Sequence, residues 1–152
     1  MKKNFQPFML CVTVSFLFCL TTVAKAPVAQ KQKKAPVFLV SADKFEKITK
    51  SHLPVVLDVY ADWCPPCRKM KPIFDDAARD FIKEWRFAKI SIESFADSDP
   101  TIAFLKSRYG VTIKCIPTFI IIIKNKVISV IEGSMDLSSL KTKISTILKD
   151  SK

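Results

Sequence analysis

Residues 54–72, PVVLDVYADWCPPCRKMKP, decide the fold of this chain. The apolar, β-branched run at 55–60 predicts a buried strand, and residues 68–78 predict a helix. Cys64 and Cys67 therefore lie where a strand leads into a helix N-terminus, and the helix macrodipole there favours the thiolate form of a cysteine. We expect Cys64 to be the exposed, attacking sulfur and Cys67, one turn into the helix, to be its shielded partner.

Length and charge limit the number of domains and the classes of binding partner. The chain has 152 residues, enough for one domain plus an N-terminal extension, and its apolar fraction of 49% supports a real core. Six of the 25 basic residues lie in the first 34 positions, where no acidic residue occurs. The remaining 19 basic and 14 acidic residues give the rest of the chain a net charge of +5. Because no patch interleaves basic and aromatic residues, this composition does not predict nucleic-acid binding.

Residues 1–24 predict an export signal. Two lysines near the start are followed by an almost continuously apolar run at 8–20, and Thr22-Val23-Ala24 offers small residues at the −3 and −1 positions of a signal-peptidase site. The apolar run is short for a membrane-spanning helix, so we expect cleavage, with an uncleaved anchor over residues 5–24 as the alternative. Either outcome would place the domain outside the cytoplasm, in the periplasm or an equivalent compartment.

The order of the remaining elements predicts an α/β domain. Residues 25–36, rich in Lys, Ala, Gln and Pro, predict a flexible linker, and the folded domain is expected over residues 37–150. The predicted strands are 37–40, 55–60, 87–93, 118–123 and 127–131, and further helices are predicted to begin near Ser41, Pro100 and Asp136. This order, βαβαβαββα, predicts a single domain in which helices flank a mostly buried sheet.

Several landmarks accompany the two cysteines in order along the chain. They are the WCPPC motif itself, Asp58 and Lys89 in predicted strands, Pro72 in the helix, the segment Ile116-Pro117-Thr118, and Gly133 after the last strand. With these landmarks the chain resembles the thioredoxin family across about residues 37–150. The resemblance implies the thioredoxin fold, a central mixed sheet flanked by helices, and a redox-active Cys64–Cys67 pair. The phrase YADWC is also similar to the C-terminal domains of bacterial membrane thiol-disulfide interchange proteins.

The resemblance implies roles for further residues. Asp58, a carboxylate within an apolar run, would be a buried proton acceptor beside Lys89 that assists Cys67. Pro117 would be cis, and because it has no N–H to compete, Ile116 would pair with an extended substrate strand. The substrate-binding residues expected on this basis are Trp63, Pro65, Pro66, Ile116 and Pro117.

Some residues depart from the family pattern. Pro65 replaces the glycine of the usual WCGPC motif, and Tyr60 replaces a tryptophan. Pro65 and Pro66, in the first helical turn, remove two N–H donors that would otherwise solvate the Cys64 thiolate, so we expect this thiolate to be less stabilised than in strong oxidants. The large helical insertion of bacterial disulfide-forming oxidants has no room in this chain.

Other interpretations of the cysteines are weaker. A structural zinc site needs about four ligands, and the mature domain offers one histidine, His52, and one further cysteine, Cys115. A purely structural disulfide between Cys64 and Cys67 would close a very short loop and gain little stability. Cys115 is either an inert buried thiol or, as the resemblance to some animal thioredoxins implies, an extra reactive and regulatory thiol.

Together these observations predict an exported enzyme that reduces or exchanges protein disulfides through Cys64 and Cys67. The sequence contains no flavin or nicotinamide motif, so no cofactor is expected besides the dithiol itself. The expected partners are protein disulfide substrates and a dithiol electron donor, such as a membrane thiol-disulfide interchange protein, and we expect a monomer. The alternatives are a binding module that holds extended peptides without turnover, and a disulfide donor or isomerase.

Overall fold

The computed structural model describes residues 35–150. Its elements in chain order are β1 (Val37–Leu39), α1 (Ala42–Thr49), β2 (Val55–Tyr60), α2 (Pro65–Asp80), β3 (Arg86–Ser91), α3 (Pro100–Tyr109), β4 (Thr118–Ile123), β5 (Lys126–Glu132) and α4 (Leu137–Asp150). The predictions for residues 1–24 and for most of the linker at 25–36 lie outside the described residues. Within the described range, no helix has both the length and the apolar character that a membrane crossing requires.

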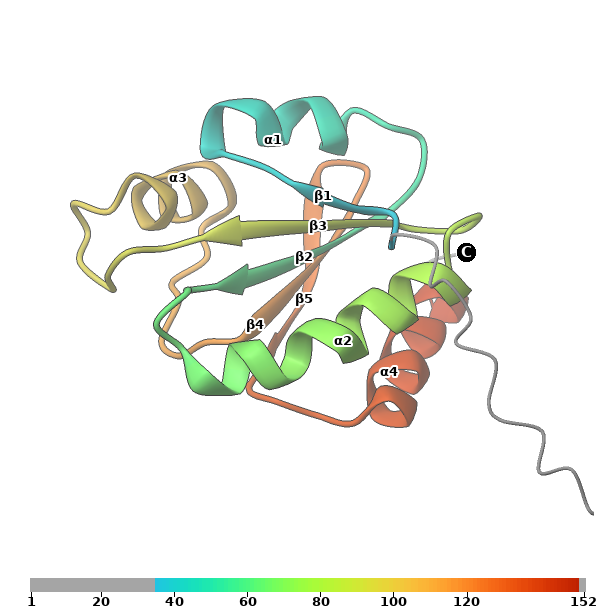
Figure 1. Cartoon of the computed structure of the whole chain (residues 1–152). Helices are drawn as coiled ribbons and strands as arrows, with labels where there is room; N and C mark the ends of the chain where they lie inside the picture. The colour runs from blue at the N-terminus through green and yellow to red at the C-terminus, as the bar shows by residue number, and fades with distance from the viewer. Residues whose placement is uncertain (1–34, 151–152) are drawn as a thin grey trace, which may run out of the picture. The chain divides into compact units, whose positions relative to one another are not determined.

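The five strands form one mixed sheet in the order β1-β3-β2-β4-β5 (Figure 1). Strands β1 and β2 are parallel to β3, whereas β4 runs antiparallel to β2 and β5 antiparallel to β4. The parallel strands need helical crossovers, but β4 and β5 are joined by a tight turn in which Lys124 and Asn125 have positive φ angles of 48° and 64°. The predicted α/β fold with a mixed sheet is therefore confirmed.

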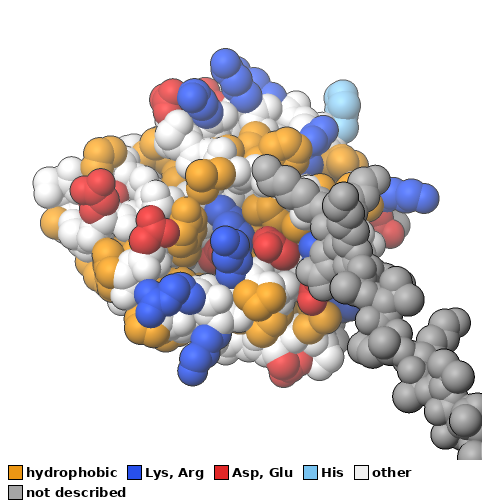
Figure 2. All heavy atoms as spheres, viewed as in Figure 1, with side chains coloured by type: hydrophobic (Ala, Val, Ile, Leu, Met, Phe, Trp, Pro, Cys, Tyr) orange, Lys and Arg blue, Asp and Glu red, His pale blue; other side chains and the backbone are white. Residues whose placement is uncertain are grey.

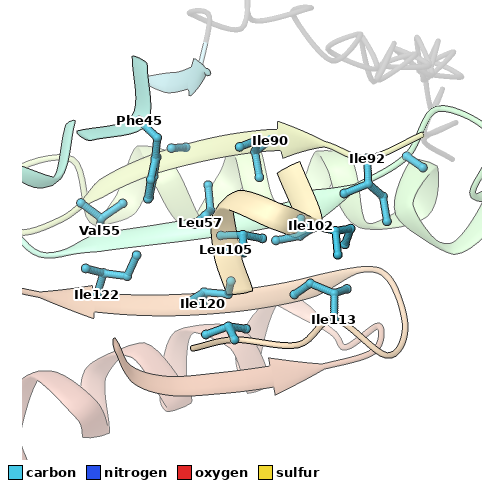
Figure 3. Packing of buried hydrophobic residues seen from close by; sticks show 14 of the residues in the cluster. Phe45, Val55, Leu57, Ile90, Ile92, Ile102, Leu105, Ile113, Ile120 and Ile122 are labelled. Atoms are coloured by element: carbon cyan, nitrogen blue, oxygen red, sulfur yellow. The ribbon is translucent and has the colours of Figure 1, made fainter. Parts of the chain in front are cut away.

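Helices cover both faces of the sheet, α1 and α3 on one and α2 and α4 on the other (Figure 1). Successive side chains of β2 point to opposite faces. Leu57 joins the apolar cluster that contains Phe45 of α1 and Leu105 of α3 (Figure 3), whereas Val56 joins the cluster of α2 and α4. Asp58 has the same parity as Val56, so the alternation of this strand directs it toward α2.

Two strands end earlier than predicted, and the first, β1, stops at Leu39, one residue short. β3 stops at Ser91, two residues before the predicted end of the alternating run. The cause is Asp99, whose Oδ2 accepts the backbone N–H of Glu93 at 2.8 Å. Glu93 therefore bonds to a loop carboxylate instead of a neighbouring strand. A helix-capping side chain thus decides where this strand leaves the sheet.

Candidate active site

The candidate site lies where β2 ends and α2 begins. Cys64 is the N-cap residue of α2, Pro65 and Pro66 occupy the first turn, and Cys67 follows. The two cysteines form a disulfide, with their Cα atoms 5.3 Å apart. The backbone N–H of Cys67 donates to the Cys64 sulfur at 3.2 Å, whereas the two prolines have no N–H to offer. The helix N-terminus and one amide N–H therefore act on the sulfur of Cys64.

Both cysteines are largely covered in this disulfide form. Cys64 is 4% exposed and Cys67 is 7% exposed, so the prediction of an exposed Cys64 is wrong for the oxidised protein, whereas Cys67 is shielded as expected. The segment before β4 covers Cys64, whose sulfur lies 3.8 Å from the carbonyl oxygen of Ile116. The two sulfurs differ instead in their surroundings, because Cys67 lines a cleft that also contains Asp58.

The segment that faces the disulfide is held at both of its flanks. The Ile116–Pro117 peptide bond is cis. The carbonyl of Pro117 accepts the N–H of Gly133 at 2.8 Å, and the Thr118 hydroxyl donates to the carbonyl of Cys115 at 2.7 Å. Cys115 itself is a free, half-buried thiol on this segment.

Trp63 and Phe95 form an exposed aromatic rim beside Cys64. Trp63 is 54% exposed, and its indole N–H donates to the carbonyl of Glu93 at 3.0 Å. Phe95, 44% exposed, meets the indole edge to face with the ring centroids 6.2 Å apart. Sequence reasoning placed Trp63 at this rim but missed Phe95, because a single aromatic residue in a polar loop carries no periodic signal.

Asp99 fixes the loop that carries Phe95. Its carboxylate accepts four backbone N–H groups, those of Glu93, Ser94, Thr101 and Ile102. Burial alone would raise the pKa of Asp99, but these four hydrogen bonds outweigh burial and lower it. Sequence reasoning missed this role, although an aspartate directly before Pro100 is a helix-cap signal.

Asp58 is buried between the sheet and α2. Its side chain is 4% exposed, and it lies opposite Lys89 in the parallel β2–β3 register. The Lys89 ammonium lies 3.8 Å from Asp58 Oδ2 and 3.7 Å from Asp75 Oδ1 on α2. Burial is the main cause that raises the pKa of Asp58 to about 7; Lys89 opposes this rise, and the Asp75 carboxylate adds to it. Asp58 therefore exchanges its proton near neutral pH.

Asp75 is a residue of this site that sequence reasoning missed. On the predicted helix it follows Cys67 and Lys71 at intervals of four, which places all three on one helical face. The structure confirms that arrangement, because all three residues line the same cleft. The sequence signal was therefore present in the spacing.

The cleft has a volume of about 520 Å³ and brings Cys67 together with the buried charges. Its charged and ionisable lining residues are Asp58, Tyr60, Asp62, Arg68, Lys71, Asp75 and Lys89. Figure 2 shows basic and acidic side chains side by side over the space between β3 and α2. Cys67 and the buried Asp58 thus line the same cleft.

The geometry supports thiol–disulfide exchange. Two sulfurs form one S–S bond, a helix N-terminus acts on the first of them, and a carboxyl group with a near-neutral pKa shares a cleft with the second. No group of three or more His, Cys, Asp or Glu side chains that could hold a metal ion occurs among residues 35–150.

Comparisons with known proteins agree with this chemistry. The family model Thioredoxin matches residues 36–146. The chain is 32% identical to the thioredoxin of Griffithsia pacifica over 104 residues, which are 68% of this chain and 87% of that protein. It is 40% identical to thioredoxin M4, chloroplastic, of Arabidopsis thaliana over 75 residues, which are 49% of this chain but only 34% of that protein. The crystal structure of thioredoxin F from spinach chloroplast (short form) matches with a TM-score of 0.62 at 27% identity, covering 75% of this chain and 95% of that one.

Proposed function

The chain belongs to the thioredoxin family of thiol-disulfide oxidoreductases, and from this premise we propose that it is an exported enzyme that reduces or exchanges disulfides in other proteins. The observation that carries this proposal is the Cys64–Cys67 disulfide at the N-terminus of α2, with Asp58 in the cleft beside Cys67. Support for export comes from the sequence, where two lysines precede an apolar run and a signal-peptidase pattern ends at Ala24.

The proposed cycle begins with the reduced protein. The Cys64 thiolate attacks one sulfur of a substrate disulfide, and the other substrate sulfur leaves as a thiolate, so a mixed disulfide joins Cys64 to the substrate. The thiolate of Cys67 then attacks Cys64 Sγ, which forms the Cys64–Cys67 disulfide and releases the second substrate sulfur. Two electrons pass from the dithiol to the substrate, and an external dithiol donor returns them.

Asp58 is the proposed proton acceptor for Cys67. Before Cys67 attacks, its thiol has to lose a proton, and the Asp58 carboxylate is the acidic group of the cleft that lies deepest from solvent. Because burial raises the pKa of Asp58 to about 7, its carboxylate is basic enough to accept a thiol proton and acidic enough to return it at neutral pH. The departing substrate thiolate is the natural recipient of that proton.

Substrates are proposed to bind along the surface between Trp63 and Ile116. The Ile116 carbonyl lies 3.8 Å from the Cys64 sulfur, so an extended segment that paired with the backbone of Ile116 would place its own cysteine against Cys64. Trp63 and the exposed prolines at 65 and 66 offer apolar contact on either side of that sulfur. The proposed electron donor is a dithiol protein, such as a membrane thiol-disulfide interchange protein.

Insulin reduction tests this function. With dithiothreitol as the donor, the protein should accelerate the precipitation of insulin chains, and Cys64→Ser should abolish the acceleration. Ser138→Cys, which adds a thiol on the exposed start of α4, controls for the mere number of cysteines. A protein that binds insulin peptides but never accelerates their reduction would be the binding module instead.

A further inference from the structure

The Lys89 ammonium forms ion pairs with two carboxylates, those of Asp58 and Asp75. Its ammonium lies 3.8 Å from Asp58 Oδ2 and 3.7 Å from Asp75 Oδ1, so neither carboxylate is a clearly preferred partner. We propose that Asp75 is a positioning residue for the proton transfer between Cys67 and Asp58, because it holds the Lys89 ammonium between two carboxylates and so withholds part of that positive charge from Asp58. This inference rests on the proposed role of Asp58.

Three elements fix the geometry of this triad. Asp58 and Lys89 are direct neighbours in the β2–β3 register, which sets the distance between their backbones. The Lys89 side chain, 11% exposed, passes over the ring of Phe74, with Nζ 5.0 Å from the ring centroid. Asp75 follows Phe74 on α2 and is 26% exposed, so it meets the ammonium from the solvent side. The lysine is therefore confined to the space between the two acids.

Among residues 35–150, Asp58 has no hydrogen-bond donor that could stabilise its carboxylate in place of Lys89. Asp58 Oδ1 is buried and makes no hydrogen bond, and Oδ2 has the Lys89 ammonium at 3.8 Å, beyond hydrogen-bond distance. The ionised form of Asp58 is thus stabilised mainly by the Lys89 ammonium, whose positive charge is shared with Asp75. Removing the charge of Asp75 would end its repulsion of Asp58 and free the ammonium to approach Oδ2, and both effects favour the ionised form of Asp58.

The other charged groups around Asp58 do not perform this function. From α2, Arg68 and Lys71 line the cleft, and the Arg68 guanidinium donates to the carbonyl of Asp62 at 3.0 Å. From β2 and the loop after it, Tyr60 and Asp62 line the cleft, and Phe119, which is opposite Asp58 on β4, has no charge. Asp75 is the group among these that contacts the same ammonium as Asp58 within 4 Å in the described chain.

Carboxyl-carbon NMR of the oxidised, intact protein tests the charge arrangement directly, since disulfide-bonded cysteines do not titrate. The Asp58 signal is identified by its loss in Asp58→Asn. Asp75→Asn should lower the titration midpoint of Asp58 by about half to one pH unit, the effect expected for one screened charge at this range. Asp75→Glu keeps a carboxylate and should stay near the wild-type midpoint. Asp76→Asn is the matched control, because it removes the same charge from the adjacent, half-exposed residue that pairs with Arg79.

A kinetic readout links the titration to catalysis. A fluorogenic peptide disulfide reports the release of the second thiol by the reduced protein in a single turnover, and the pH midpoint of that release should fall in Asp75→Asn in parallel with the NMR midpoint. If Asp75→Asn matches Asp76→Asn in both measurements, the assignment of Asp75 is wrong. If Asp58→Asn releases the second thiol at the wild-type rate over the whole pH range, the proposed role of Asp58 fails, whatever the NMR titration shows.

Discussion

The sulfur of Cys64 lies 3.8 Å from the carbonyl oxygen of Ile116, although 52 positions separate the two residues along the chain. This contact joins the N-terminus of α2 to the segment before β4, and it explains why Cys64 is covered in the disulfide form. In the proposed function, a substrate strand that reaches Cys64 pairs with the backbone of Ile116. On that proposal, the proximity of these two groups sets the direction from which a substrate disulfide approaches.

The two cysteines should behave differently when each is replaced. Cys67→Ser should accumulate mixed disulfides through Cys64, because nothing then resolves them, whereas Cys64→Ser should accumulate almost none. Non-reducing gels followed by mass spectrometry of the trapped species measure this difference. Equal trapping by the two variants would mean that attacker and resolver are assigned wrongly.

The buried Asp58 should make stability depend on pH. Its folded-state pKa of about 7 lies above the ordinary value of 3.8, so between these values the folded protein keeps a proton that the unfolded chain has lost. Stability should therefore fall as pH rises through this window, and Asp58→Asn, which lacks the charge, should gain about 2–4 kcal/mol relative to wild type between pH 4 and pH 8. Urea unfolding of the oxidised proteins at both pH values measures it. Parallel pH dependences in the two proteins would contradict the burial of an ionisable Asp58.

Asp99 should stabilise the loop behind the aromatic rim. Asp99→Ala leaves four backbone N–H groups without their acceptor and should cost about 1–3 kcal/mol of unfolding free energy. The indole of Trp63 is bonded to the same loop, so its fluorescence emission should shift to the red. Asp97→Ala, which removes an exposed acid paired with Lys106, is the control and should change neither quantity by a comparable amount.

The sequence predicted those features of the fold and the site that depend on residues close together along the chain. The apolar run ending at Tyr60, followed by WCPPC, predicted both the strand–helix junction and the position of the disulfide, because each follows from neighbouring residues. Asp58 was singled out because a carboxylate in an apolar run needs an explanation. The covering of Cys64 was predicted wrongly, because it depends on Ile116, a residue that only the tertiary fold brings close.

Two further residues, Phe95 and Asp75, were missed for different reasons. Phe95 contributes to the rim only because Asp99 folds its loop against Trp63, and no spacing in a polar loop encodes such a contact. Asp75 had a signal in its helical spacing from Cys67, but its importance comes from sharing Lys89 with a residue on another element. The expected roles of Lys89 and Cys115 remain predictions.

The N-terminal segment gives a prediction that depends on the sequence alone. If residues 1–24 form a cleaved export signal, the mature protein recovered from outside the cytoplasm should begin near Lys25. Intact-mass measurement of the purified protein identifies that terminus. Recovery of the full-length chain as a soluble cytosolic protein would contradict export, and a full-length chain in the membrane fraction would support the anchored alternative.

The reduction potential should lie on the reducing side of the family range. The Cys64 sulfur accepts one backbone N–H, that of Cys67, while Pro65 and Pro66 withhold two others, so the thiolate of the reduced protein has few donors. Between β3 and β4 the described chain contains only α3, which leaves no helical insertion of the kind found in strong disulfide-forming oxidants.

A less stabilised thiolate makes the reduced form less favoured and lowers the potential, for which we predict roughly −200 to −270 mV; thioredoxin is near −270 mV and strong disulfide donors are near −120 mV. Equilibration with glutathione buffers of known ratio, followed by the fluorescence of Trp63 beside the disulfide, measures this value. A domain with such a potential outside the cytoplasm has to be reduced continually by a partner, which fits the proposed dithiol donor. A measured value near −120 mV would instead assign the protein as a disulfide donor.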